Sequence, residues 1–169
     1  IKCLAEWIPI PGSLEAIAQL CQANFRLFII TNQSGIGRGY YSEADLAEIH
    51  QHLIQEVTQR GGHIERIYHC PHAPERQCHC RKPSIGLFEQ LQQEFQLNAS
   101  NAIYVGDKIT DLQAGDRAGA TSILLKTGYG QATLEALPDN HNYPVFANLS
   151  ALTEAILSKQ FTWTDTSPS

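Results

Sequence analysis

Apolar stretches and amphipathic stretches alternate along the chain. The apolar stretches are rich in β-branched and aromatic residues, which predicts five strands, at 25–31, 64–69, 102–106, 121–125 and 143–146. Between them, apolar residues recur at helical spacing, which predicts helices at 13–24, 42–61, 83–95, about 111–118, 132–136 and 149–158. Strands that alternate with helices predict an α/β fold built on a doubly wound, mostly parallel sheet.

Composition narrows the class of protein and of partner. A chain of 169 residues with 43% hydrophobic residues can bury the core of one domain, which we place at 1–159, with 160–169 as a polar, flexible tail. The net charge of −5 favours neither nucleic acid nor an anionic membrane as partner. No apolar run is long enough to span a bilayer. The scarcity of any exposed apolar stripe favours a monomer, the cytoplasm is the default location, and we expect a small molecule as partner.

A cysteine-rich loop follows the second predicted strand. Four residues within eleven positions offer three sulfurs and one imidazole: Cys70, His72, Cys78 and Cys80. Tetrahedral zinc binds such a set, and four protein ligands leave no open position, so the zinc would be structural. The alternative is a pair of disulfides or free thiols. The odd total of five cysteines fits a reducing compartment with a metal better than a disulfide framework. Zinc would pin the loop and aim Arg81 and Lys82.

Polar clusters come directly after predicted strands or the loops that follow them. They are Thr31-Asn32-Gln33-Ser34, leading into a glycine-rich run with Arg38, then Arg81-Lys82, and Asp107-Lys108. Ligands of doubly wound folds bind beyond the carboxyl ends of the strands. We therefore expect all three clusters to face one crevice.

These residue types suit phosphate chemistry. Asp107 is placed to bind magnesium, and Asp111, one helical turn later, could orient a metal-bound water or cap the helix. Thr31 and Asn32 can donate to phosphoryl oxygens. Cationic side chains can bind phosphate, as point charges or by bidentate contacts; here they are Arg38, Arg81, Lys82 and Lys108.

At these residues the chain resembles the haloacid-dehalogenase-like (HAD) phosphatases. The family's hydroxyl residue, lysine and G-D-x-x-x-D loop correspond to Thr31, Lys82 and the run 106–111. The runs T-N-Q-S-G-I-G-R-G and C-P-H…C-H-C-R-K-P resemble its histidinol-phosphatase and heptose-bisphosphatase group, and the likeness covers about 2–156.

The resemblance implies a magnesium-dependent phosphomonoesterase without a large cap domain. Its expected substrate is a sugar bisphosphate, a heptose 1,7-bisphosphate that would lose its C7 phosphate through an aspartyl-phosphate. Thr31 and Lys82 would stabilise the phosphoryl group, and Asp107 would complete the magnesium site. Arg81 would recognise the substrate and Lys108 would contact phosphate, with further substrate contacts from Asn32, Gln33, Ser34 and Arg38.

One departure from the family pattern matters. The family attacks phosphorus with the first Asp of a D-x-D motif on its first strand, and this sequence contains neither D-x-D nor methionine. We therefore expect the chain to be incomplete at its N-terminus and to lack that strand. Histidinol phosphate is the alternative substrate. The net negative charge and the lack of a basic stripe disfavour a polynucleotide 3′-phosphatase. A non-catalytic, zinc-stabilised sugar-phosphate-binding module is the alternative of another class.

Overall fold

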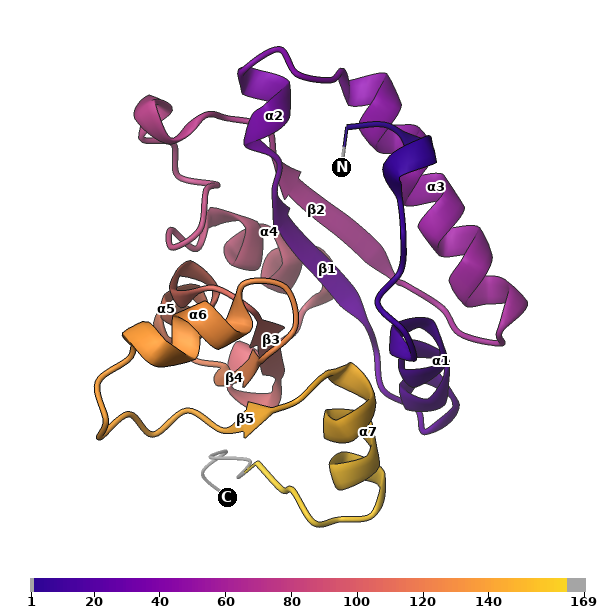
Figure 1. Cartoon of the computed structure of the whole chain (residues 1–169), viewed down its shortest axis with the longest axis vertical. Helices are drawn as coiled ribbons and strands as arrows, with labels where there is room; N and C mark the ends of the chain where they lie inside the picture. The colour runs from indigo at the N-terminus through magenta and orange to yellow at the C-terminus, as the bar shows by residue number, and fades with distance from the viewer. Residues whose placement is uncertain (1, 164–169) are drawn as a thin grey trace. The chain divides into compact units, whose positions relative to one another are not determined.

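The computed structural model describes residues 2–163 and divides the chain into two compact units, Ile1–Arg81 and Lys82–Ser169. The first unit contains a two-stranded sheet and its helices (Figure 1). Its elements, in chain order, are η1 (Leu4–Glu6), α1 (Ser13–Gln22), β1 (Phe28–Asn32), α2 (Ser34–Gly37), α3 (Glu43–Gln59), β2 (Arg66–Cys70) and η2 (Pro74–Arg76).

Strands β1 and β2 are parallel, and their register determines which residues end side by side. Thr31 lies beside His69, and Asn32 lies beside Cys70. Carboxyl ends of parallel strands meet at the same edge of the sheet. The T-N-Q run and the cysteine-rich loop therefore leave the sheet next to each other.

The core of the first unit forms where α1 and α3 pack together beside the sheet. Leu14, Val57 and Ile64 are buried there, and Trp7 and Leu53 pack against them. Leu14, Leu53 and Val57 follow the helical spacing of apolar residues in α1 and α3, as expected for helices with one buried face.

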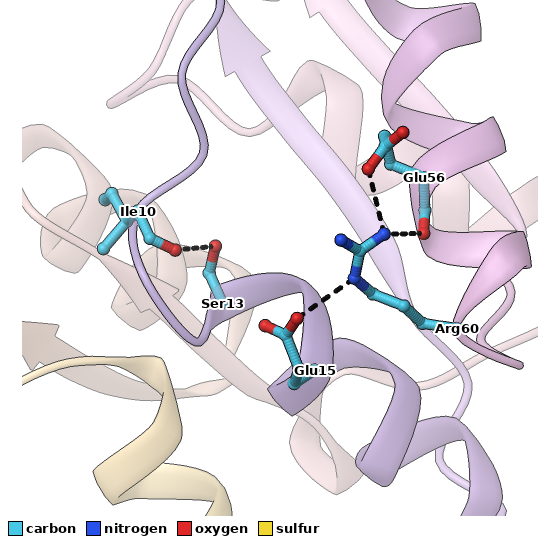
Figure 2. A network of polar contacts seen from close by, with 5 residues as sticks. All are labelled: Ile10, Ser13, Glu15, Glu56 and Arg60. Carbon is cyan, nitrogen blue, oxygen red and sulfur yellow. Dashed lines mark hydrogen bonds and ion pairs between the residues drawn. The ribbon is translucent and has the colours of Figure 1, made fainter.

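A polar network joins the same two helices (Figure 2). At the end of α3, Arg60 donates Nη1 to the carbonyl and carboxylate of Glu56, at 2.8 and 2.9 Å, and Nε to Glu15 of α1 at 3.1 Å. Ser13 donates its hydroxyl to the Ile10 carbonyl at 2.7 Å, at the point where α1 begins. Arg60 thus links the end of α3 to α1, and Ser13 closes the turn that leads into α1.

The second unit holds three parallel strands in the order β3-β4-β5. Its elements, in chain order, are α4 (Gly86–Phe95), η3 (Ala99–Asn101), β3 (Ile103–Gly106), α5 (Ile109–Ala118), β4 (Thr121–Leu125), α6 (Gly130–Ala136), β5 (Val145–Phe146) and α7 (Leu149–Leu157). Helix α5 packs on β3 and β4, and α7 packs on β5. Leu112, Ile123, Leu124 and Leu152 are completely buried in this unit's core.

The observed elements confirm the α/β class and shift several predicted boundaries. Every strand pair among residues 2–163 is parallel. The glycine-rich run predicted as a loop contains a helical turn, α2, and the predicted strand 143–146 is reduced to Val145–Phe146. Tyr143 leaves that strand because its backbone N–H donates to His141 and its hydroxyl donates to Asp116.

The predicted tail lies largely beyond the described residues. Residues 164–169, the larger part of the predicted tail, lie outside the described range. Within residues 2–163 there is no helix with both the length and the apolar character that crossing a bilayer requires.

Candidate active site and metal centre

Three thiols and one imidazole gather in the segment that begins at the end of β2. Their ligand atoms all lie within 4.8 Å of one another, and they come from Cys70, His72, Cys78 and Cys80. The Cys80 sulfur lies 3.0 Å from that of Cys70 and 3.4 Å from that of Cys78, and His72 Nδ1 lies 3.2 Å from the Cys80 sulfur. Thiolates about 2.3 Å from a tetrahedral zinc stand roughly 3.8 Å apart. One zinc ion therefore fits the cluster with little rearrangement.

The crowding of the sulfurs separates their pKa values. Burial raises the pKa of the Cys78 thiol, but hydrogen bonds with Cys80 and Cys70 outweigh burial and lower that pKa to about 6. Burial, together with the hydrogen bonds that the Cys80 thiol donates to Cys70 and Cys78, raises the pKa of Cys80 to about 12. A thiolate at Cys78 near neutral pH is the ligand form that zinc needs, and a bound cation would favour the thiolate at the other two.

The cysteine-rich loop is attached to the glycine-rich run by backbone hydrogen bonds. The Gln33 N–H donates to the Cys70 carbonyl at 2.8 Å, and the Gly37 N–H donates to the Pro71 carbonyl at 2.9 Å. A Cβ on Gly37 would lie 2.7 Å from that same carbonyl, closer than side chains tolerate. Glycine at this position therefore lets α2 and the metal-binding loop approach each other.

Arg81 is held by a carbonyl of the metal-binding loop. Its Nη1 donates to the backbone oxygen of His72 at 3.2 Å, so one of the predicted zinc ligands also orients the arginine. Arg38, by contrast, lies 3.7 Å from Glu75, and both side chains are exposed. Exposed ion pairs of this kind contribute little to stability, so Arg38 can exchange Glu75 for an anionic ligand at small cost.

Thr31 has a defined donor direction at the end of β1. Its Oγ1 accepts from Gln33 Nε2 at 3.0 Å, and Gln33 Oε1 accepts from the Tyr41 hydroxyl at 2.6 Å. With a lone pair of Oγ1 occupied in this way, the hydroxyl proton of Thr31 can point to another acceptor. Gly35 has no room for a Cβ because the Tyr41 ring lies against it. Both ends of the Gln33 amide are thus engaged, and Gln33 orients Thr31.

Lys82 is buried and has two specific partners in the second unit. Its Nζ lies 2.7 Å from Asp111 Oδ1 and donates to the Tyr104 hydroxyl at 2.9 Å. Lys82 is 8% exposed and Asp111 is 5% exposed. Because buried charges persist only when they are paired and hydrogen-bonded, the pair defines one position for the ammonium group. Burial raises the pKa of Tyr104, so its hydroxyl remains neutral and can accept this bond.

Asp111 also caps the start of α5. Its Oδ2 accepts the backbone N–H groups of Asp107 and Lys108, at 3.2 and 3.1 Å. The carboxylate would overlap a Cβ on Gly106, which explains why glycine precedes Asp107. Of the two roles expected for Asp111, the capping role is therefore present, and it is combined with an ion pair to Lys82.

Asp107 is turned so that one carboxylate oxygen is available. Among residues 2–163, the hydrogen bond that reaches its carboxylate ends on Oδ2, from the Tyr129 N–H at 2.9 Å. Thr133 donates its hydroxyl to the Asp107 carbonyl at 2.7 Å, so backbone and side chain are both fixed. A partly exposed carboxylate oxygen at the end of a strand suits magnesium, which keeps most of its waters and takes one or two carboxylates.

The predicted site residues are therefore distributed over both units. Thr31, Asn32, Gln33, Ser34, Arg38, Arg81 and the zinc ligands belong to Ile1–Arg81, and Lys82, Asp107, Lys108 and Asp111 belong to Lys82–Ser169. Within the units, the structure brings together the four predicted zinc ligands, Thr31 with Gln33, and Lys82 with Asp111. That all clusters face one crevice stays a prediction.

Sequence reasoning did not single out three tyrosines that support these groups. Tyr41 orients Gln33, Tyr104 binds Lys82, and Tyr129 donates to Asp107 through its backbone. A usable signal existed only for Tyr104, because a tyrosine in a buried strand needs a hydrogen-bond partner for its hydroxyl. The partners of Tyr41 and Tyr129 depend on loop conformations that the pattern of residues does not specify.

Comparison with known proteins places the chain in a family. Residues 79–152 match the model of the HAD-hydrolase-like family. The chain is 41% identical over 158 residues to D-glycero-beta-D-manno-heptose-1,7-bisphosphate 7-phosphatase of Pseudomonas putida, covering 93% of this chain and 89% of the relative. It is 40% identical over 115 residues to the corresponding alpha enzyme of Campylobacter jejuni, covering 66% of each.

Solved structures agree with this placement. The crystal structure of D,D-heptose 1,7-bisphosphate phosphatase from B. bronchiseptica, complexed with magnesium and phosphate, is 38% identical, with a TM-score of 0.89 over 94% of this chain and 89% of that chain. The enzyme of the same name from Burkholderia thailandensis is 33% identical, with a TM-score of 0.72 over 90% and 88%. The chain therefore belongs to the HAD-like hydrolases. Its similarity within the family is to the heptose-bisphosphate phosphatases, which confirms the resemblance.

Proposed function

We propose that this protein is a magnesium-dependent phosphomonoesterase that removes the C7 phosphate from D-glycero-D-manno-heptose 1,7-bisphosphate. The observation that carries the proposal is the arrangement after β3, where Asp107 offers a carboxylate oxygen and Asp111 fixes the ammonium of Lys82. Relatives with 38–43% identity and that name support the substrate. Three that cover 93–94% of this chain are named for the beta anomer, which favours that anomer here.

In the second unit, Asp107 and Lys82 carry the proposed catalytic roles. Asp107 would hold magnesium, which supplies positive charge to the phosphoryl oxygens. Lys82 stabilises the charge that develops on the transferred phosphoryl group, because its ammonium is already fixed by Asp111 and Tyr104 before substrate binds. Lys108, at the exposed start of α5, contacts phosphate.

In the first unit, Thr31 donates its hydroxyl to the phosphoryl group and Arg81 recognises the substrate. Gln33 supports this donation by occupying an acceptor site of Thr31 Oγ1. Asn32, Ser34 and Arg38 supply further substrate contacts. Zinc in the four-ligand cluster would hold the loop whose His72 carbonyl orients Arg81.

The net reaction is hydrolysis of a phosphate monoester. The bond between phosphorus and the C7 oxygen breaks, an oxygen from water joins phosphorus, and a proton goes to the departing sugar oxygen. The residues assigned above bind, orient and stabilise charge. The family resemblance assigns the nucleophile to an aspartate of a D-x-D motif, which is not among these 169 residues.

The proposal also covers the cellular location and the oligomeric state of the protein. The thiols that form the zinc cluster need a reducing compartment, which supports a cytoplasmic location. We expect a monomer, and size-exclusion chromatography with light scattering would test that expectation.

The decisive experiment measures substrate selectivity of the full-length native protein, loaded with zinc and magnesium. Phosphate release is followed with both anomers of the heptose 1,7-bisphosphate and with histidinol phosphate, and ³¹P NMR identifies which phosphate is lost. We expect kcat/KM for the beta bisphosphate to exceed that for histidinol phosphate by at least about 100-fold, because a site that pairs polar groups of its substrate rejects analogues strongly.

Asp107→Asn is the matched control, and it should abolish magnesium-dependent release. Equal or better turnover of histidinol phosphate would replace the proposed substrate. Tight binding of the bisphosphate without phosphate release would instead favour the non-catalytic binding module.

A further inference from the structure

The loop between β4 and α6 has an unusually close contact with Asp107. In the sequence Lys126-Thr127-Gly128-Tyr129-Gly130, the Tyr129 N–H donates to Asp107 Oδ2 at 2.9 Å. Gly128 has a φ of +60° and lies against the same carboxylate, so a Cβ there would overlap Asp107 Oδ2. The Gly130 N–H closes the turn by donating to the Thr127 carbonyl at 2.9 Å. The backbone of Tyr129 is therefore fixed at the proposed magnesium ligand.

Although its backbone is held in this way, Tyr129 is 63% exposed. Lys108 Nζ lies over the Tyr129 ring, 4.1 Å from its centroid, within the range of a cation–π contact. Lys108 is anchored as well, because its backbone N–H donates to Asp111 Oδ2 at 3.1 Å. The backbone of Tyr129 is thus fixed by Asp107, and the backbone of Lys108 is fixed by Asp111.

We propose that Tyr129 is a specificity-determining residue that presents the Lys108 ammonium to a second anionic group of the substrate. The inference rests on the proposed function and deepens it, since a bisphosphate keeps one phosphate outside the reacting centre. A lysine side chain loses much rotamer freedom when it binds an anion. The ring of Tyr129 removes part of that freedom in advance, which strengthens binding by preorganisation.

The chemistry of the contact fits this role. A cation–π contact uses the face of the ring and the charge of the ammonium, so N–H groups on the side away from the ring can still donate to phosphate oxygens. Lys126, in the same loop, is also exposed but has no ring contact among the described residues. It therefore provides a matched lysine that adds charge without this orientation.

The test compares Tyr129→Ala and Tyr129→Phe in the full-length native protein with two substrates, the heptose 1,7-bisphosphate and the heptose 7-phosphate. Tyr129→Ala should raise KM for the bisphosphate roughly two- to fivefold with kcat within about twofold, as expected for loss of an exposed cation–π contact. KM for the 7-phosphate should not change. Tyr129→Phe keeps the ring face and should behave like wild type with both substrates.

Lys108→Ala provides the coupling test. In that background Tyr129→Ala should have no further effect on KM for the bisphosphate, and Lys126→Ala alone should leave this KM within about twofold of wild type. Independent, multiplying effects of the two substitutions would overturn the inference. So would a rise in KM from Lys126→Ala that equals the rise from Lys108→Ala, because general positive charge would then suffice.

Failure of the inference and failure of the proposed function give different results. If wild type hydrolyses the bisphosphate and Tyr129→Ala leaves KM unchanged, the function stands and the inference is wrong. If wild type releases no phosphate, the function fails, and calorimetric titration with the bisphosphate decides the inference. Weaker binding by Tyr129→Ala than by wild type would then support it, and equal affinity or no binding by either protein would overturn it.

Discussion

Arg81 and Lys82 are adjacent in the sequence, but their side chains are held by different means. Arg81 donates to the His72 carbonyl, within a loop of four potential metal ligands. Lys82 forms a buried ion pair with Asp111 and a hydrogen bond with Tyr104, on a strand and helix of a packed core. One cation thus depends on a loop that a metal can organise, and the other on charge pairing inside the fold.

The difference has energetic consequences. The loop is rich in polar residues and contributes little to the apolar core, so we expect its order to depend on metal binding. The lysine and aspartate pair needs no metal, but each charge becomes costly if the other is removed. Removing zinc should therefore release Arg81 and spare Lys82, and substitutions around Lys82 should do the reverse.

The largest expected effect is on the metal-dependent loop. Cys78→Ser removes the thiol whose pKa is lowest, and zinc should fall from about one ion per chain to nearly none, since structural zinc sites are worth on the order of 10 kcal/mol. Elemental analysis after dialysis measures this directly. Cys3→Ser, at an exposed cysteine outside the cluster, is the control and should keep the metal. Full zinc retention by Cys78→Ser would mean that Cys78 is not a ligand, and the contrast between a metal-dependent Arg81 and a metal-independent Lys82 would lose its support.

The next largest effect concerns the buried ion pair. Asp111→Asn should lower the free energy of unfolding by about 3–5 kcal/mol, because the Lys82 ammonium would stay buried without a counter-charge. Urea denaturation measures the change, and zinc content should be unaffected. Asp139→Asn, at an exposed aspartate of the same unit, is the control and should have a much smaller effect. Loss of zinc in the Asp111 variant would show that the cysteine-rich loop and the ion pair of Lys82 with Asp111 are not independent.

Tyr104→Phe tests the second partner of Lys82 while preserving ring packing against Phe88, whose ring centroid is 4.7 Å away. Loss of one hydrogen bond to a charged group should lower the free energy of unfolding by about 1.5–3 kcal/mol. Because Lys82 would be less well oriented, kcat should fall more than KM changes. Steady-state kinetics measures this split, and a change confined to stability would assign Tyr104 a structural role alone.

The smallest effect involves an outer pair of the second unit. The Tyr143 hydroxyl donates to Asp116 at 2.6 Å, and that hydrogen bond, followed by burial, raises the pKa of Tyr143 to about 12. A raised pKa in the folded state stabilises the protein below the unfolded value near 10, and this stabilisation is lost as pH rises from about 10 to 12. Tyr143→Phe should therefore remove part of the alkaline destabilisation that we expect of wild type. Denaturation at pH 9 and pH 11 provides the comparison.

Local patterns predicted much of this molecule. The alternation of strands and helices, the Ser42 capping box of α3 and the glycine that ends α5 follow from propensities and periodicities that act over a few residues. The spacing of the cysteines and His72 also sufficed to predict a single metal site, because ligands so close in sequence can reach one ion with little chain folding.

The sequence by itself determined the α/β class, the four ligand atoms of the zinc cluster and the residue types available for phosphate. Only the tertiary structure decided that Asp111 caps α5 and pairs with Lys82, that Gln33 orients Thr31, and that the Tyr129 backbone binds Asp107. The physical reason is that these partnerships depend on packing and burial. Burial makes a charge or a hydroxyl require a particular partner, and no local pattern of residues states which partner the fold will bring within reach.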